Sequence, residues 1–289
     1  MTVTYDTMKQ TARMLYERAL KRIPENSKQA LAEALRTETS APARATLNFM
    51  IGSAVRAEEK STFVCSDAGF PVYFVKIGTG VQFGGDIRQA IIDAFDDLVA
   101  TIEPPILKFV TNPLTGERSY HGKDMPHISW DIVSGVDYID IICSPKALGS
   151  GRWAALEIFS YPTLEEIERY ILDVSIRAGS QHCPPVVIGV GIGGSFDHAA
   201  KLAKLQTLRP FGTANPEPIL AAMEDRLTRA VNATGFGPMG TGGDTTALGV
   251  HIDYASGHGF TPVAVCFNCW INRRTSARIH SSGEVEILE

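Results

Sequence analysis

The chain has 289 residues, 44% of them hydrophobic and 20% charged, so it can bury a large core as one big domain or two smaller ones. Its formal charge of -5 and its pI near 5.8 argue against a nucleic-acid binder, which would present a basic face. No run of about 18 apolar residues occurs, and the first residues lack the charged-then-apolar order of a signal peptide. We therefore expect neither a nucleic-acid partner nor a membrane.

The first sixty residues are predicted to be helical. Tyr5–Ile23, Asn26–Leu35 and Ala41–Glu58 each place apolar residues on one face at helical spacing. Pro24 separates the first two of these helices. Residues 1–60 are therefore expected to form the helical part of the molecule.

Residues 61–289 have a mixed character, in which β-prone runs alternate with amphipathic helices and glycine-rich loops. The predicted strands are Thr62–Cys65, Pro71–Lys76, Ile106–Val110, Tyr138–Cys143, Trp153–Phe159, Pro185–Gly189, Ala247–Tyr254, Thr261–Cys266 and Val285–Leu288. The predicted helices are Asp86–Ile102, Thr163–Ala178, Ser195–Leu205 and Pro216–Asn232, and Thr163-Leu-Glu-Glu166 has the capping-box pattern. The whole pattern predicts an α+β fold over a single domain, residues 1–289, with an N-terminal helical segment followed by a mixed α/β region.

Five cysteines without a secretion signal indicate a reducing compartment, which we expect to be the cytoplasm. Cys65, Cys183 and Cys269 each lie at a predicted turn or loop that fits an iron–sulfur cluster better than a disulfide. Three thiolates on a four-iron cluster would leave one iron without a protein ligand and able to act as a Lewis acid. Cys143 and Cys266 are interpreted as buried core thiols, the commonest fate of a free cysteine.

Two further patterns leave alternatives open. Gly189–Gly194 matches G-x-G-x-x-G between a strand and a helix, which alone would indicate a dinucleotide site. A second strand ending in an acidic residue is missing, so the backbone geometry of a tight turn explains the glycines without a nicotinamide cofactor. Cys266-Phe-Asn-Cys269 could be a redox pair or half a zinc site, although no compact histidine pair accompanies it. Two alternatives to a cluster-dependent enzyme therefore stay open. One is an NAD-dependent oxidoreductase, and the other is a non-catalytic iron–sulfur or zinc scaffold, such as a regulatory or assembly subunit.

Several motifs occur in a specific order along nearly the whole chain. They include Cys65-Ser-Asp-Ala-Gly69, Pro145-Lys146-Ala-Leu-Gly149-Ser150 and the segments 127–135, 183–194, 235–248 and 262–269. In this combination the chain resembles the iron–sulfur hydro-lyases of the class I fumarase and L(+)-tartrate dehydratase family, specifically the α subunit or N-terminal region. The first two motifs are similar to that family's C-Q-D-T-G and P-K-G-G-G-S.

The resemblance implies a [4Fe-4S] cluster, held by Cys65, Cys183 and Cys269. It places Asp67 beside the substrate, gives Gly149 a close backbone contact, and makes His258 the counterpart of a family histidine. Lys146 and either Arg273 or Arg274 could bind the carboxylates of a substrate, with arginine doing so in bidentate fashion. The catalytic candidates are therefore Asp67, Lys146 and His258, and the substrate-binding candidates are Ser66, Gly149 and Arg273.

The implied reaction is the reversible loss of water from a small 2-hydroxy dicarboxylate, of the fumarate/malate or tartrate/oxaloacetate type. A base must remove a weakly acidic hydrogen, and fixed donors must stabilise the charge that develops on the carboxylate. The family completes its site with a β subunit or a C-terminal domain, so we expect a β-subunit partner that supplies the base, in an α2β2 assembly.

Three departures from the family patterns lie near the expected substrate site and bear on which hydroxy acid is used. Ser66 and Ala68 replace the family's Gln and Thr, Ala147-Leu148 replaces two glycines, and Asp244 stands where lysine is usual. None of them removes a cluster cysteine.

Overall fold

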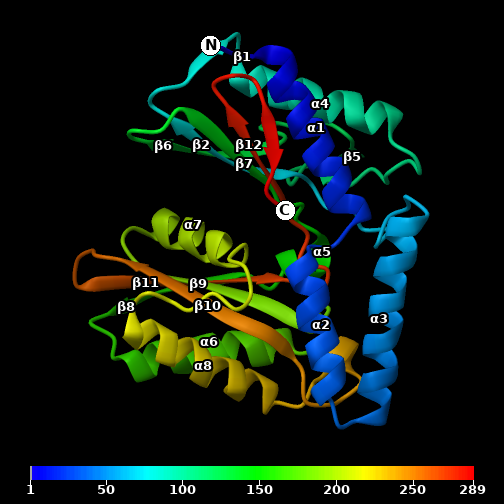
Figure 1. Ribbon diagram of the computed structural model, residues 1–289. Coiled ribbons are helices and arrows are strands. Elements are labelled where there is room, and N and C mark those ends of the chain that lie inside the picture. The colour runs from blue at the N-terminus through cyan, green and yellow to red at the C-terminus, as the bar shows by residue number, and fades with distance from the viewer. Residues whose placement is uncertain (1) are drawn as a thin grey trace. The chain divides into compact units, whose positions relative to one another are not determined.

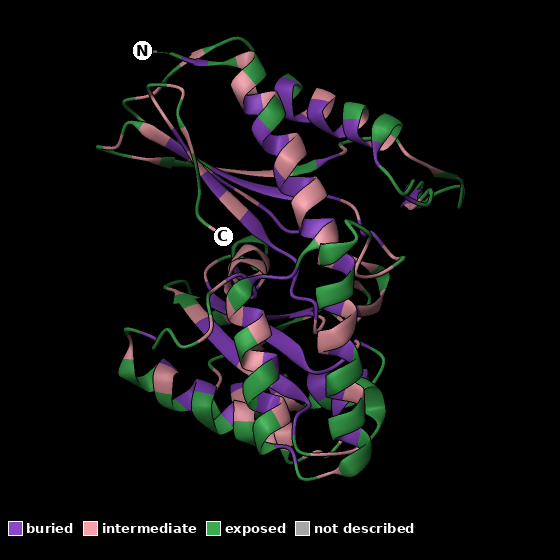
Figure 2. Ribbon diagram, turned by 45° about the vertical axis from the view of Figure 1, so that its right-hand side comes forward, coloured by how far each residue is buried: buried purple, intermediate pink, exposed green. Residues whose placement is uncertain are grey.

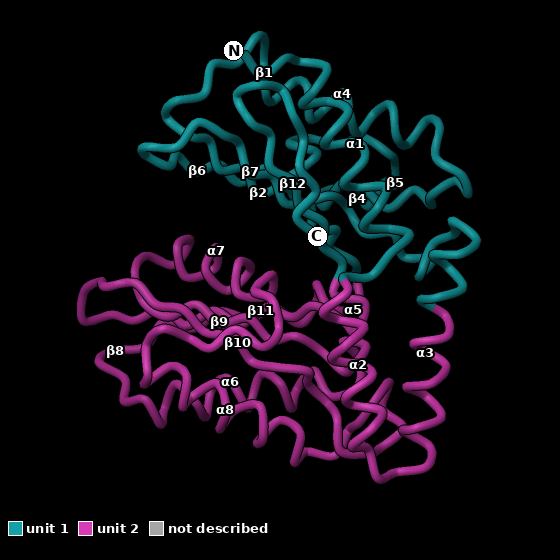
Figure 3. The backbone as a smooth tube through the Cα atoms, in the orientation of Figure 1, with its two compact units in different colours: residues 1–24, 54–147, 273–289 teal, residues 25–53, 148–272 magenta. Residues whose placement is uncertain are grey.

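The computed structural model describes residues 2–289 and divides into two compact units (Figure 3). Unit 1 comprises Met1–Pro24, Ala54–Ala147 and Arg273–Glu289, and unit 2 comprises Glu25–Ser53 and Leu148–Asn272. Neither unit is a continuous stretch of the sequence. The single-domain organisation expected from the sequence stays a prediction.

A five-stranded sheet of order β13-β12-β7-β2-β6 forms the centre of unit 1. Its register sets Tyr73 opposite Cys143 and Ile141 opposite Ala277, so alternate residues of three strands share one buried face. β2 is parallel to β6 and antiparallel to β7, which is antiparallel to β12. The strands are β2 (Val72–Gly78), β6 (His127–Val133), β7 (Tyr138–Cys143), β12 (Thr275–His280) and β13 (Val285–Ile287).

Two helices cover the buried face of this sheet, α1 (Tyr5–Lys21) and α4 (Ile87–Thr101) (Figure 1). Their inward faces are buried along the length of each helix, as the helical spacing of apolar residues predicts (Figure 2). Thr4 caps α1 and Asp86 caps α4, because each side chain accepts a hydrogen bond from a backbone N–H of the first turn. The short strands are paired as β1 (Thr2–Thr4) with β3 (Gln82–Gly84) and β4 (Val110–Thr111) with β5 (Arg118–Ser119).

Unit 2 is built on a four-stranded sheet of order β10-β9-β11-β8, with α6 and α8 on one face and α7 on the other (Figure 1). The strands are β8 (Ala155–Ser160), β9 (Val186–Gly193), β10 (Ala247–Ala255) and β11 (Phe260–Asn268). The helices are α2 (Glu25–Thr37), α5 (Leu148–Gly151), α6 (Leu164–Ala178), α7 (Phe196–Gln206), α8 (Pro218–Asn232) and the 3-10 turn η1 (Pro238–Gly240). Helix α3 (Ala41–Glu59) has residues in both units. Every residue of β9 is buried, since helices cover both faces of the sheet.

The glycines of β9 allow α7 to approach the sheet closely. A Cβ at Gly189 would lie 2.1 Å from Ala203 O, and one at Gly191 would lie 2.1 Å from Ala199 O. The predicted end of the strand at Gly189 was wrong, because the pairing with β10 continues through Gly193. These glycines are explained by helix–strand contact, which favours backbone geometry over a nicotinamide site.

Gly191→Ala is expected to destabilise the chain by about 3 kcal/mol, because the added methyl group collides with the α7 backbone and the helix must move. The free energy of unfolding in urea, followed by circular dichroism, measures the effect. Gly249→Ala in β10 is the matched control. Its Cβ would meet His251 at 3.5 Å, an ordinary contact, so we expect a change below about 1 kcal/mol. Equal stability of the two variants would contradict the role given to Gly191.

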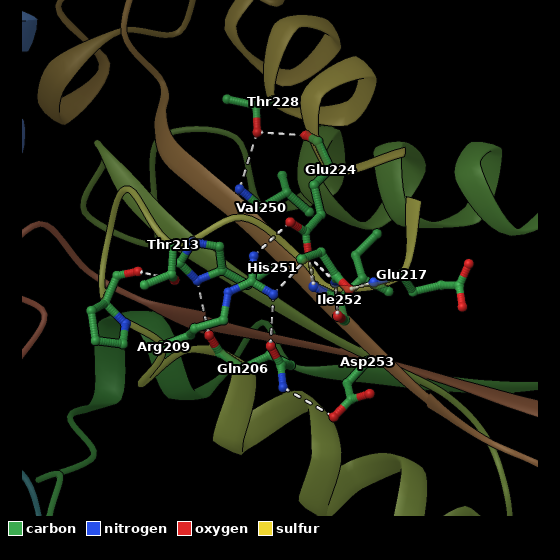
Figure 4. Close-up of polar contacts among 12 residues, drawn as sticks. Gln206, Arg209, Thr213, Glu217, Glu224, Thr228, Val250, His251, Ile252 and Asp253 are labelled. Carbon is green, nitrogen blue, oxygen red and sulfur yellow. Dashed lines mark hydrogen bonds and ion pairs between the residues drawn. The ribbon is translucent and has the colours of Figure 1, made fainter. Parts of the chain in front are cut away.

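A buried network of hydrogen bonds connects α8 to β10 (Figure 4). Arg209 donates to both oxygens of Glu224, from Nη1 to Oε1 at 2.9 Å and from Nη2 to Oε2 at 2.5 Å. Glu224 Oε1 also accepts from Asn215 Nδ2 at 2.8 Å and from the backbone N–H of Ile252 at 2.7 Å. These donors satisfy the buried carboxylate, so the network specifies where the helix meets the strand.

The predicted α+β class with its N-terminal helical segment is confirmed, and so is the capping box of Thr163 and Glu166. Two predicted strands were wrong: Thr62–Cys65 is irregular, and of Ile106–Val110 only Val110 enters a strand, β4. Five strands were missed: β6 and β12 of the five-stranded sheet, and the short strands β1, β3 and β5. Within residues 2–289, no helix has the length and apolar character needed to cross a membrane.

Candidate metal centre

Cys65 lies in an irregular loop of unit 1 between α3 and β2, and its side chain is partly buried. Asp67 Oδ1 accepts a hydrogen bond from Gly69 N at 3.3 Å, so the aspartate supports the turn that follows the cysteine. Gly69 has φ +71, and a Cβ there would lie 2.7 Å from the carbonyl carbon of Lys146. Only glycine suits this position, since it combines a left-handed conformation with contact to a second backbone segment.

The segment that contains Lys146 runs beside this loop. Phe70 N donates to Lys146 O at 3.1 Å, and Lys146 N donates to Phe70 O at 2.9 Å. Asp67 and Lys146, two of the predicted catalytic residues, therefore belong to neighbouring backbone segments of unit 1. Ser66, a predicted substrate-binding residue, is exposed in the same loop.

Arg273 is buried in unit 1 and donates from Nη1 to two carbonyl oxygens of the Cys65 loop. The acceptors are Asp67 O at 2.6 Å and Ala68 O at 2.7 Å. The sequence suggested Arg273 only as a substrate-binding cation. The contact with the loop could not be foreseen, because it joins positions more than 200 residues apart in the sequence.

Cys183 and Cys269 lie on two loops of unit 2 that are hydrogen-bonded to each other. Trp270, which directly follows Cys269, donates from its backbone N to Cys183 O at 3.1 Å. Both thiols are partly buried. Cys183 has φ +60, an uncommon conformation for a residue with a side chain. The structure therefore brings together two of the three predicted cluster ligands.

Gly149 lies directly against the sulfur of Cys183. A Cβ at this position would be 3.2 Å from Cys183 Sγ, closer than side-chain carbons normally come to a neighbour. Gly149 belongs to the short helix α5, within the motif that the sequence singled out for a close backbone contact. The glycine thus leaves the space beside this sulfur free of a side chain.

The other two cysteines are core residues, as predicted. Cys143 is completely buried in the centre of unit 1, and burial raises the pKa of its thiol far above the ordinary value. Cys266 is buried in β11 on the side of the sheet that faces α7. The structure therefore separates the five thiols into two inert ones and three with partial access to solvent.

His182, directly before Cys183, is a buried residue that the sequence did not single out. It is completely buried beside the ring of Phe267, and within residues 2–289 neither ring nitrogen has a hydrogen-bond partner. Burial lowers the pKa of this imidazole to about 4, so the ring is neutral at pH 7. The sequence signal that could have identified His182 is its position directly before a candidate ligand, in the tetrapeptide His-Cys-Pro-Pro.

His258, the third predicted catalytic residue, lies in the turn between β10 and β11 and is exposed. Its ring stacks on Phe260 with 5.8 Å between the centroids. Across the described part of the chain, no hydrogen bond ties it to a cysteine. Its catalytic role stays a prediction.

Asp244, where the family pattern has lysine, holds a loop in place. Its Oδ2 accepts from Thr39 N at 2.9 Å and from Thr39 Oγ1 at 2.6 Å, and its own N–H donates to Glu38. The hydrogen bonds from Thr39 lower the pKa of the carboxyl group. In this chain the residue ties the loop before β10 to the connection between α2 and α3.

The donor set of the three partly buried cysteines suits an iron–sulfur cluster, since thiolates are the ligands that such clusters prefer. Cys183 and Cys269 fit this use, because their loops are joined and Gly149 leaves space at one sulfur. Cys65 belongs to unit 1 and the other two to unit 2. In residues 2–289, no group of three histidine, cysteine, aspartate or glutamate side chains is arranged to hold a metal ion.

A profile of the fumarate hydratase family matches residues 9–278. The chain therefore belongs to the fumarate hydratase family and is a hydro-lyase, which confirms the family expected from the motifs. It is 36% identical over 271 residues to a Methanocaldococcus jannaschii protein provisionally named L(+)-tartrate dehydratase subunit alpha, a match that covers 92% of this chain and 95% of the relative. It is also 30% identical over 275 residues to the L(+)-tartrate dehydratase subunit alpha of Escherichia coli strain UTI89, covering 92% of this chain and 89% of the relative.

Proposed function

We propose that this chain is the cluster-binding α subunit of a [4Fe-4S]-dependent hydro-lyase that reversibly dehydrates a 2-hydroxy dicarboxylate. The observation that carries the proposal is the hydrogen bond from Trp270 N to Cys183 O, which joins the loops of Cys183 and Cys269, together with Gly149 against the Cys183 sulfur. Cys65 would supply the third thiolate. Membership of a hydro-lyase family supports the reaction class.

The cluster, when bound, would supply Lewis-acid activation of the substrate hydroxyl as a leaving group. Every other task falls to protein groups. Asp67 and His258 are this chain's candidates for proton transfer and Lys146 is its candidate cation, while the general base would come from the β subunit. Ser66, Gly149 and Arg273 are the candidates for holding the substrate carboxylates.

The charge of Arg273 supports an anionic ligand in unit 1. The residue is 5% exposed, and its Nε has no partner in the described chain. Its hydrogen bonds go to backbone carbonyls, which offer no negative charge to balance the guanidinium. A dicarboxylate or an anionic cluster would provide that balance.

The substrate class is proposed as fumarate/malate or tartrate/oxaloacetate. The names of the two relatives favour L(+)-tartrate, whereas the family profile is that of fumarate hydratases. Comparison of kcat/KM for L-malate, fumarate and L(+)-tartrate tests the proposal. No turnover of any of the three by a cluster-loaded preparation with its partner would contradict it.

We also propose a β-subunit partner that completes the active site, in an α2β2 assembly. The support is that both relatives are named alpha subunits. The five cysteines form no disulfide within residues 2–289, which is in keeping with a reducing, cytoplasmic setting.

The isolated chain is expected to turn over substrate at least about a hundredfold more slowly than the same chain with its β subunit, because a missing general base costs that much or more. Anaerobic dehydratase assays with and without the partner measure the difference. Full activity of the isolated chain would refute the split site. A fourth protein ligand on the metal would point instead to the non-catalytic scaffold.

A further inference from the structure

The loop that carries Cys65 is held by hydrogen bonds to three successive backbone carbonyls. Arg273 Nη1 donates to Asp67 O and Ala68 O, and Tyr16 Oη donates to Gly69 O at 2.7 Å. Tyr16 is completely buried in α1, and Arg273 is 5% exposed. Water therefore cannot readily replace either donor.

Arg273 itself is anchored at the beginning of a strand. Ser144 Oγ donates to its carbonyl oxygen at 2.9 Å, and Thr275, which opens β12, donates from Oγ1 to Leu15 O at 2.6 Å. Thr275 is also paired with Cys143 in the sheet. The guanidinium thus extends from a fixed segment of backbone. A long side chain anchored in this way can hold a loop in one position.

The neighbouring arginine shows that burial alone does not explain the contact. Arg274 is 4% exposed, but its Nε donates to Glu289 Oε2 at 2.8 Å and its Nη2 to Oε1 at 3.1 Å. Arg273 has no such carboxylate within residues 2–289, and its bonds go to the Cys65 loop. The two adjacent buried arginines thus differ in the contacts described here: Arg273 donates to the Cys65 loop, and Arg274 donates to Glu289.

We infer that Arg273 is a positioning residue, which with Tyr16 fixes the loop that presents Cys65 and Asp67. Arg273 follows Cys269 by four residues in the sequence, so the segment that carries one proposed ligand continues directly into the side chain that holds the loop of another. The effect on Cys65 as a cluster ligand rests on the proposed function. The effect on the loop does not.

The test is hydrogen exchange of the full chain without cluster, followed by mass spectrometry. Arg273→Met is expected to speed exchange in the peptide that spans residues 62–71 by about tenfold, because local opening of the loop becomes easier. Arg273→Lys should restore part of the protection, since an ammonium can also donate to two carbonyls. Arg274→Met is the matched control, in which this peptide should exchange as in the unaltered chain.

Tyr16→Phe provides a second, independent variant, because it removes the bond to Gly69 O and leaves the buried ring in place. It should loosen the same peptide, and in both Arg273→Met and Tyr16→Phe the Cys65 thiol should be alkylated faster. Unchanged exchange and alkylation in both variants would overturn the inference. An equal response of the loop in Arg274→Met would also overturn it, since the effect would then be general destabilisation.

Cluster reconstitution separates this inference from the proposed function. Arg273→Met should take up less iron than Arg274→Met under the same anaerobic conditions. If the unaltered chain takes up no cluster while the exchange results hold, the proposed function fails and the positioning role stands. If the cluster assembles but the loop does not respond to the variants, the positioning role fails alone.

Discussion

Cys269→Ser is expected to abolish cluster assembly and to lower dehydratase activity by about a thousandfold or more. Serine is a poor replacement for a soft thiolate ligand, and Lewis-acid stabilisation of the transition state by a metal is worth several kcal/mol. Iron and acid-labile sulfide content after anaerobic reconstitution, with activity in the presence of the β subunit, measures the effect. Cys65→Ser and Cys183→Ser should behave in the same way.

Cys266→Ala is the matched control for this prediction. Cys266 lies three residues before Cys269 but is buried in β11 against α7, so its loss should leave iron and sulfide content unchanged. Retention of the cluster in all three serine variants would remove the basis of the proposed function. Loss of iron in Cys266→Ala as well would instead indicate a fourth thiolate ligand, as in a non-catalytic scaffold.

The second large effect is expected on stability. Arg209→Met should lower the free energy of unfolding by about 3–5 kcal/mol, because it leaves the buried carboxylate of Glu224 without its cation. The side chains of the pair are only 17% and 10% exposed, so water cannot compensate for the loss. Urea unfolding monitored by circular dichroism measures the change, and protection of β10 amides from exchange locates it.

Arg226→Met is the matched control for the second prediction, because it breaks another arginine–glutamate pair of α8. Arg226 bonds to Glu168 at the surface, where its side chain is 48% exposed, and such pairs contribute about 1 kcal/mol or less. Equal losses of stability in the two variants would show that the buried network in Figure 4 has no special role.

Elements with strong local signals were predicted well from the sequence. The helix α6 begins at the capping box of Thr163 and Glu166, and both hydrogen bonds of that box are present. β7 has the predicted bounds, Tyr138–Cys143. In such segments the apolar periodicity and the terminal residues contain most of the necessary information.

Elements that depend on distant partners were predicted poorly. β6 is half exposed, and among the described residues it pairs with β2 alone. Its alternation is therefore weak, and its strand character comes from that pairing. β12 was missed, and its partner β7 lies more than 130 residues earlier in the chain. Ile106–Val110 has apolar residues because Ile106 and Val110 fill the core of unit 1, and it was mistaken for a strand.

The sequence by itself determined the family, the three candidate cluster cysteines and the reaction class, because short motifs retain the residue types that the chemistry requires. It also predicted that Cys143 and Cys266 are core thiols, which their burial confirms. Only the tertiary structure decided that Gly189 and Gly191 serve helix contact and that the loops of Cys183 and Cys269 are joined. It also decided that Arg273 holds the Cys65 loop. Each of these features depends on packing or pairing between segments far apart in the chain, which local sequence does not encode.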